Sequence, residues 1–177
     1  MENVYKIYPI LTAKLDLDKG TFTYRSHYGE KVMAPVYAWL ILGANEPILV
    51  DTGCIVREAA RLSPVFTGEE GPDIETSLRN RGVSVSDIRT IILTHLHVDH
   101  FLNAGKFPRA RFIVQEAELN FSRNPHPVFA KSYQKGWYEG INFETIRGDA
   151  EILPGLNVMF TPGHTPGTQS VAVDTEG

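Results

Sequence analysis

The spacing of apolar and polar positions changes from a strand-like to a helix-like pattern about one third of the way along the chain. The first 50 residues hold short runs rich in Val, Ile, Tyr and Phe, separated by Gly, Asn and Pro. Such runs are typical of strands joined by tight turns. They predict strands over Val4–Leu17, Thr21–Tyr24, Ala34–Leu42 and Pro47–Val50. We therefore expect a sheet to form most of the first third.

A helical pattern begins after Pro72. Residues 73–82 start with Asp73, place Ile74 and Leu78 four positions apart and end at Gly82, which predicts a short helix. Strand and helix patterns then alternate. Extended segments are expected over Arg111–Val114, Asn157–Thr161 and Gln169–Asp174, and a helix over Glu116–Phe121. The mixture predicts an α/β protein of the α+β type.

Composition limits the number of domains and the classes of partner. A chain of 177 residues with 42% apolar and 21% charged side chains can build one well-buried core, so residues 1–177 are expected to form a single domain. The net charge of −4, with no cluster of Lys or Arg, argues against a nucleic-acid partner.

Membrane insertion and export are also not expected. The longest apolar run, Val36–Leu42, is far shorter than the roughly 20 residues that cross a bilayer. Polar residues interrupt the apolar positions near the N-terminus, unlike the basic-then-apolar order of an export signal. A single cysteine, Cys54, allows no internal disulfide and is expected to be a small buried side chain. These features predict a cytoplasmic protein without a membrane partner.

The segment Thr94–His100 contains three of the six histidines and follows the apolar run Thr90–Leu93. His95 and His97 are two positions apart, so in an extended segment they lie on the same side with Cα atoms about 6.8 Å apart. Both rings can then bind one ion at about 2.0–2.1 Å. Leu96 and Val98 alternate with them and can turn into the core.

Asp99 and His100 come one step later, where the chain turns, and can address a second ion beside the first. Their carboxylate oxygen and imidazole nitrogen are ligands that zinc, iron and manganese accept. The alternative is a group of surface histidines at a helix start, with Asp99 as the N-cap. The density of histidines at the end of an apolar strand favours metal binding. A helix is expected to start at Phe101 and to end at Gly105.

One further ligand candidate is His164, in the segment Thr161–Gly167. Two Pro-Gly pairs surround this histidine, directly after the predicted strand, and they define a tight loop that keeps the ring at the rim of the protein. His164 would complete the ligand set of His95 and His97. The contexts of His27 and His126 carry no such signal, so both are expected at the surface.

Three motifs in this order, Asp51-Thr52-Gly53, then residues 95–100, then residues 162–167, resemble the metallo-β-lactamase superfamily of hydrolases. Residues 107–115, Glu118 and residues 161–167 are most similar to its N-acyl homoserine lactonase branch. The resemblance runs from about Val36 to the last residue. It implies an αββα sandwich with a dinuclear metal site, usually of zinc.

Carried over position by position, the resemblance implies that His95, His97 and His164 bind one ion, and that Asp99 and His100 bind the other. It also places Asp99 among the catalytic residues. Asp51 matches a residue that orients a ligand, although a carboxylate that simply closes a turn is an equally good interpretation of Asp51.

The family pattern continues to an Asp that bridges both ions, a substrate-contacting Tyr and a last His. After His164 the only carboxylates are Asp174 and Glu176, and neither is assigned as the bridge. We therefore expect an incomplete second half, without the C-terminal strands and helix of the full fold, and a weak second metal site. The strand at 169–174 is expected to have an open edge with Val171 and Val173 exposed, which favours a homo-oligomer or a complementing chain.

The implied activity is opening of lactone rings, as in N-acyl homoserine lactones and quorum quenching, by attack of metal-bound hydroxide. The aromatic stretch Phe121–Tyr138 is expected either to line an acyl-chain site or to belong to the core; this stretch includes Phe129, Tyr133, Trp137 and Tyr138. Two alternatives stay open: a glyoxalase-type thioester hydrolase, and a catalytically impaired metal-binding fragment.

Overall fold

The computed structural model describes residues 4–63, 66–133 and 135–176. Its strands are β1 (Lys6–Asp18), β2 (Lys31–Leu42), β3 (Ile48–Val50), β4 (Thr67–Glu70), β5 (Thr90–Ile92), β6 (Arg111–Gln115), β7 (Phe143–Ile146), β8 (Ala150–Leu153), β9 (Leu156–Phe160) and β10 (Gln169–Val173). Its α-helices are α1 (Val56–Leu62), α2 (Ile74–Arg79), α3 (Val98–Phe101) and α4 (Glu116–Arg123). Short 3₁₀ helices cover Lys19–Thr21, Ala104–Lys106, Pro127–Ser132 and Lys135–Tyr138. The predicted mixed α/β class is confirmed.

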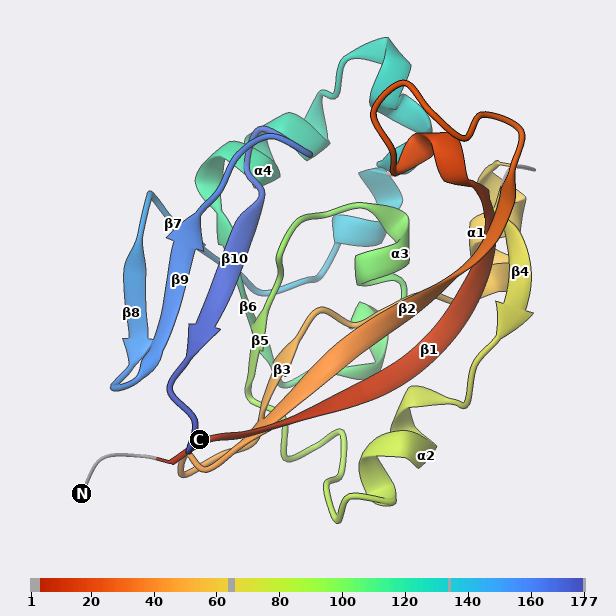
Figure 1. The fold of residues 1–177 in the computed structure, drawn as a ribbon. Coiled ribbons are helices and arrows are strands. Elements are labelled where there is room, and N and C mark those ends of the chain that lie inside the picture. The colour runs from red at the N-terminus through yellow and green to blue at the C-terminus, as the bar shows by residue number, and fades with distance from the viewer. Residues whose placement is uncertain (1–3, 64–65, 134, 177) are drawn as a thin grey trace.

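The strands form two sheets (Figure 1). The larger has the order β4-β1-β2-β3-β5-β6-β7, and the smaller has the order β10-β9-β8. Strands β3, β5, β6 and β7 are parallel, whereas β1 and β2 form a long antiparallel pair. Because β3 and β5 are parallel neighbours, the segments that follow them emerge at the same edge of the sheet.

The central strands of the larger sheet are apolar at nearly every position because both of their faces are covered. Leu49, Ile91 and Phe112 belong to a core on the face packed against α2, α3 and α4. Their neighbours Ile92 and Ile113 belong to a second core, shared with Leu156 and Val158 of the smaller sheet. The layers are therefore helices, large sheet and small sheet, in agreement with the αββ part of the expected sandwich.

The expected strand at Thr21–Tyr24 is wrong. Residues 19–21 form a 3₁₀ turn, because the Asp18 carboxylate accepts hydrogen bonds from the amides of Gly20 and Gly29 and closes a loop there. Phe22 and Tyr24 project into solvent with exposed fractions of 60% and 89%. A β-rich composition was outweighed here by local hydrogen bonding to a turn carboxylate.

The start of the helix after the histidine motif also differs from the expectation. Helix α3 begins at Val98, with His97 as its N-cap residue, so Asp99 lies in the first turn and is not the N-cap. Phe101 is the last residue of this helix, and a separate 3₁₀ turn follows at residues 104–106. The alternative that Asp99 serves as an N-cap is therefore wrong.

Burial or exposure was also predicted from the sequence for Cys54, Val171 and Val173. Cys54 is buried, as expected, with 2% of its surface exposed. Val171 and Val173 are half-buried against the core between the sheets, so the expectation that they are exposed is wrong. Among the helices of the described residues, none is long and apolar enough to cross a bilayer.

Candidate metal centre

Two loops and helix α3 carry the predicted ligands, and a third loop carries Asp51. Residues 94–97 follow β5, the Asp51-Thr52-Gly53 turn follows β3, and residues 161–168 connect β9 to β10. The backbone amide of Gln169 donates to the carbonyl oxygen of Thr94 at 2.9 Å, which ties the start of β10 to the end of β5. The His164 loop is thereby held beside the first histidine motif, although 67 positions separate His97 from His164 in the sequence.

The structure brings His95, His97 and His164 together. One ring nitrogen from each lies within 4.8 Å of the others. Nδ1 of His97 is 3.0 Å from Nε2 of His164. Two nitrogen ligands of a tetrahedral zinc ion are separated by about 3.3 Å, so this spacing is close to that of a ligand pair.

The cluster contains buried nitrogen atoms without partners. Within the described residues, Nε2 of His95 and Nε2 of His97 are the only buried side-chain nitrogens or oxygens that lack a hydrogen bond. Burial, followed by the charges of the neighbouring imidazoles, holds the pKa of His95 far below its usual range. Burial and the nearby His164 ring lower the pKa of His97 to about 4. A neutral imidazole keeps a free lone pair on one ring nitrogen, which is what a divalent cation requires. His95 offers Nε2 and His97 offers Nδ1, the atom beside Nε2 of His164, so these residues fit a metal ion.

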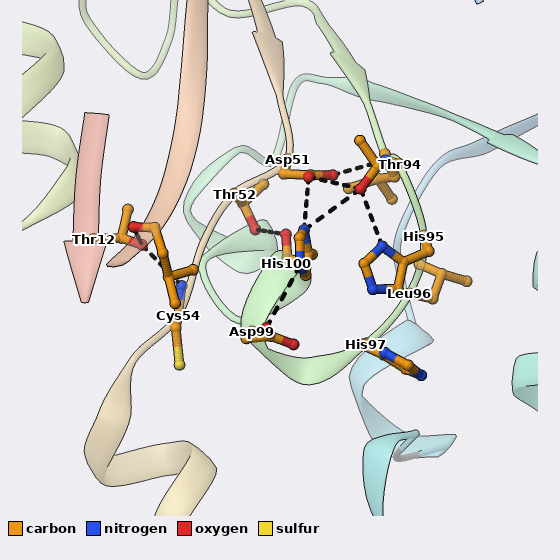
Figure 2. Close-up of polar contacts among 12 residues, drawn as sticks. Thr12, Asp51, Thr52, Cys54, Thr94, His95, Leu96, His97, Asp99 and His100 are labelled. Atoms are coloured by element: carbon orange, nitrogen blue, oxygen red, sulfur yellow. Dashed lines mark hydrogen bonds and ion pairs between the residues drawn. The ribbon is translucent and has the colours of Figure 1, made fainter. Parts of the chain in front are cut away.

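A hydrogen-bond chain fixes the orientation of His95 (Figure 2). The hydroxyl of Thr94 donates to Oδ2 of Asp51 at 2.8 Å and lies 3.1 Å from Nδ1 of His95. Since the hydroxyl proton points to Asp51, Nδ1 of His95 is the donor to Thr94. The tautomer of His95 therefore leaves its Nε2 lone pair facing the cluster.

Asp51 performs the same task for His100. Its Oδ2 accepts from Nδ1 of His100 at 2.7 Å, and its Oδ1 accepts from the amide of Thr94 at 2.7 Å (Figure 2). Asp51 is only 3% exposed. Burial alone lowers the pKa of His100, but the charge and hydrogen bond of Asp51, with the charge of Asp99, raise it to about 9. Of the two interpretations of Asp51, the geometry favours orientation of a ligand.

Asp99 and His100 lie beside the three-histidine cluster. The rings of His95 and His100 are 4.1 Å apart between centroids, and Nε2 of His100 is 3.5 Å from Oδ2 of Asp99. Both side chains are partly exposed, at 28% for Asp99 and 27% for His100. A nitrogen and a carboxylate oxygen therefore face one another at the position expected for a second ion.

The turn at residues 51–53 also anchors helix α3. The amide and hydroxyl of Thr52 donate to the carbonyl oxygen of His100 at 2.8 and 3.2 Å. The amide of Leu102 donates to the carbonyl oxygen of Gly53 at 3.1 Å. These bonds fix the backbone that carries His100.

Two cavities border the histidines. The first, of about 490 Å³, is lined by His97, Phe121, Phe129, Tyr133, Pro162, Gly163, His164, Thr165 and Pro166. The second, of about 290 Å³, is lined by Leu15, Leu17, Phe22, Ala34, Pro35, Val36, Tyr37, Trp39, Asp51, Asp99 and His100. Apolar side chains therefore line one cavity beside His97 and His164 and another beside Asp99 and His100.

The aromatic stretch divides between the two interpretations given for it. Phe129 and Tyr133 line the larger cavity. Trp137 and Tyr138 are packed against the main core. Tyr133 serves both purposes, because it is 4% exposed and its ring lies 5.0 Å from that of His97.

The other polar residues singled out in the sequence lie elsewhere. His27 pairs with Glu30 at the surface, and His126 is exposed at the start of a 3₁₀ helix. Asp174 follows β10 at the end that neighbours Tyr5, opposite to the end that is bound to Thr94. As expected, His27 and His126 do not belong to the metal-ligand group.

Sequence reasoning gave no role to Thr94, and Glu118 entered only through a resemblance. Thr94 lies between Asp51, His95 and His100, and Glu118 is fully buried and bonded to both histidine loops. A threonine at a strand end has an ordinary β propensity, and a single glutamate in a short helix is usually a surface residue. The only signal for Thr94 was its place directly before His95.

Comparison with known proteins agrees with this geometry. Residues 33–177 match the Metallo-beta-lactamase superfamily. The chain is 31% identical over 185 residues to the N-acyl homoserine lactonase of Bacillus cereus, covering 98% of this chain and 72% of that protein. It is similar in structure to an N-acyl homoserine lactone hydrolase with the product N-hexanoyl-L-homoserine bound at the catalytic metal centre, with a TM-score of 0.86 and 29% identity over 99% of this chain and 72% of the other. A variant of B. thuringiensis AiiA with N-decanoyl-L-homoserine at its active site gives a TM-score of 0.85 at 29% identity, with the same shares covered.

Proposed function

We propose that this chain, which belongs to the metallo-β-lactamase superfamily and within it to the N-acyl homoserine lactonases, opens the ring of N-acyl homoserine lactones. As a member of this family it is a metal-dependent hydrolase that acts on lactones. The observation that carries the proposal is the cluster of His95, His97 and His164, whose ring nitrogens lie within 4.8 Å of one another.

The proposed ligands of the first ion are His95, His97 and His164, and the proposed metal is zinc. Three neutral imidazoles suit zinc, and they leave the open position that a catalytic site needs. When bound, the metal polarises the ester carbonyl and lowers the pKa of water toward about 7. Iron and manganese accept the same donors, so metal analysis decides between them.

Asp99 and His100 are the proposed ligands of a second ion. The described residues supply two ligands there against three at the first position, so we expect the second ion to be held more weakly. Asp99 also lines the smaller cavity, and its carboxylate lies 3.5 Å from Nε2 of His100, beside the three-histidine cluster. We assign Asp99 as the catalytic carboxylate on this ground.

The larger cavity is the proposed site for the acyl chain. Its wall combines the half-exposed Phe129 with Tyr133 and Pro162, and it opens directly beside His97 and His164. Burial of a methylene group contributes about 0.8 kcal/mol, so long-chain lactones should bind more tightly than short ones. A cytoplasmic location is proposed as well, since Cys54 is the only cysteine and is buried.

The test combines metal content with turnover. His97→Ala should lose the ion and lower lactone hydrolysis by at least 100-fold, since two histidines seldom retain catalytic zinc. His126→Ala is the matched control for metal binding, because that histidine is exposed and outside the cluster; its zinc content should equal that of the parent.

Substrate choice is tested in the same assay. The parent should open lactones with acyl chains of different length and leave a glutathione thioester unchanged. Unchanged zinc in His97→Ala would refute the ligand assignment. Tightly held zinc without lactone turnover would favour the catalytically impaired alternative, and faster turnover of the thioester would favour the glyoxalase-type activity.

A further inference from the structure

Glu118, on helix α4, is a fully buried carboxylate between the two histidine loops, with 0% of its surface exposed. Its Oε1 accepts from the backbone amide of Leu96 at 2.9 Å and from the hydroxyl of Tyr133 at 3.0 Å. Its Oε2 accepts from the hydroxyl of Thr165 at 2.6 Å and from the backbone amide of Gly167 at 3.2 Å. Both oxygens are therefore fully used by donors.

The two oxygens serve different loops. Leu96 lies between His95 and His97, and Thr165 directly follows His164. We propose that Glu118 is a positioning residue that sets the distance between His164 and the His95–His97 pair, and thereby the affinity and geometry of the metal site. This inference rests on the proposed ligand roles of the three histidines.

The contact between Glu118 and the His164 loop leaves no room for a side chain at Gly167. A Cβ atom on Gly167 would lie 2.2 Å from the Glu118 nitrogen and 2.3 Å from the Glu118 Cβ. Such distances are far shorter than any van der Waals contact. The glycine therefore allows the loop backbone to lie directly on α4, where its amide reaches the carboxylate.

The chemistry of the contact is unusual for a residue that only fills space. Burial of a carboxylate costs several kcal/mol unless donors replace the lost water. Within the described residues no Lys, Arg or His forms an ion pair with Glu118, so its four donors supply this compensation. Two of the donors are backbone amides of the ligand-bearing loops. Unlike a hydroxyl, a backbone N–H cannot rotate to find another acceptor.

The substitution Glu118→Gln separates acceptor chemistry from volume. An amide accepts on one side only, because its NH₂ group donates. The hydroxyls of Tyr133 and Thr165 can rotate to accept from that group, but the amide of Leu96 or of Gly167 would face another N–H. One loop must therefore lose its bond while the shape of the side chain is preserved.

We expect Glu118→Gln to raise the dissociation constant for zinc by about 10- to 100-fold, measured by chelator competition. The cobalt-loaded variant should show an altered visible absorption spectrum, because the ligand geometry changes. The matched control is Glu116→Gln, which makes the same change two positions away on the exposed side of α4, where Glu116 pairs with Arg147. The control should leave both affinity and spectrum unchanged.

A second variant keeps the inference testable if Glu118→Gln does not fold. Thr165→Val removes the 2.6 Å bond to Oε2, together with the 2.7 Å contact with the Thr168 hydroxyl, at nearly constant volume, and it should weaken zinc binding with an altered cobalt spectrum. A role in stability alone would lower the unfolding temperature of the metal-free chain and leave the metal affinity and spectrum of the folded protein unchanged; that result overturns the inference. If His97→Ala loses zinc while these variants bind it normally, only the role of Glu118 fails.

Discussion

At the scale of single residues, the metal centre depends on which nitrogen of each histidine is engaged by the protein. Thr94 occupies Nδ1 of His95, and Asp51 occupies Nδ1 of His100. Since Asp51 also accepts from the amide and hydroxyl of Thr94, one carboxylate orients two rings. The rings of His95 and His100 are thus held in defined orientations before any ion binds.

Replacing Asp51 by Asn tests this arrangement. If the Asn oxygen accepts from Nδ1 of His100, the Asn NH₂ group must face the backbone N–H of Thr94. If the Asn side chain is flipped, its NH₂ group faces the N–H of His100 instead. We expect Asp51→Asn to lower kcat/KM for lactones by about 10- to 100-fold. Asp87→Asn, which changes an exposed turn carboxylate bonded to Ser84, serves as the control, and equal losses in both variants would contradict the assignment.

The histidine pKa values predict how stability depends on pH in the metal-free chain. The pKa of His97 is about 4 in the folded chain and near 6.5 in the unfolded chain. The unfolded chain therefore binds a proton first, and the folded state loses stability as pH falls from 6.5 toward 4. The pKa of His100 is about 9 in the folded chain. The stability that protonated His100 gives to the folded state is therefore complete below pH 6.5 and is lost as pH rises through 9.

We therefore expect the free energy of unfolding in urea, with chelator present, to fall between pH 6.5 and 9. In His100→Gln this alkaline dependence should be weaker than in the parent chain. An identical alkaline slope in the two proteins would show that His100 does not carry the shift.

The ligand residues were the part of the site most accessible from sequence. His95, His97, His100 and His164 follow apolar strands and lie in short, recognisable motifs, so their proximity could be predicted. Thr94 and Glu118 act through contacts with residues far away in the sequence, and such contacts leave no local periodicity. Their roles needed the three-dimensional arrangement.

At the scale of elements, short turns position the ligands. The turn after β3 uses Gly53 with a φ of +74°, and a Cβ atom there would lie 2.1 Å from Oγ1 of the buried Thr12. The carbonyl oxygen of Gly53 in this turn accepts a hydrogen bond from the backbone amide of Leu102, which anchors α3. A side chain at Gly53 should therefore disturb both the sheet and the helix that carries His100.

Gly53→Ala should be clearly more destabilising than Gly82→Ala. Gly82 has the same φ of +74°, but no atom lies within 4 Å of a Cβ there. The left-handed conformation alone costs about 1–2 kcal/mol, and overpacking adds about 1–3 kcal/mol for Gly53. Denaturant unfolding of both variants measures the difference; equal losses would contradict the close contact with Thr12.

Long apolar strands and the helix after Pro72 were predictable because their patterns extend over several residues. The short elements were not. Strand β4 has the sequence TGEE with every side chain exposed, and it forms because the long β1 offers a free edge. The N-cap residue of helix α1 makes no side-chain hydrogen bond; the first backbone amides of this helix donate instead to the carboxylate of Glu70 on β4. Tertiary pairing, and not local propensity, determines these elements.

At the scale of the whole molecule, the larger sheet connects both cores. Each of β3, β5 and β6 contributes side chains to the core under the helices and to the core between the sheets. We propose on this ground that residues 1–177 form one domain. Strand β10 lies at the edge of its sheet, next to an apolar cavity of about 380 Å³ that includes the half-exposed Ile7 and Trp39, and we propose that a second copy pairs there.

Calorimetry tests both proposals together. One domain should give a single unfolding transition, and pairing between copies should raise its midpoint as protein concentration increases. Two separate transitions would contradict the single domain. A midpoint independent of concentration would contradict association through β10.

The central claim is that imidazoles from two distant loops bind one catalytic metal ion, and anomalous diffraction from crystals of the zinc-loaded chain tests it most directly. We expect a zinc peak about 2.0–2.1 Å from one ring nitrogen of each of His95, His97 and His164. A peak that lies elsewhere, or a His164 ring turned away from the ion, would contradict the account.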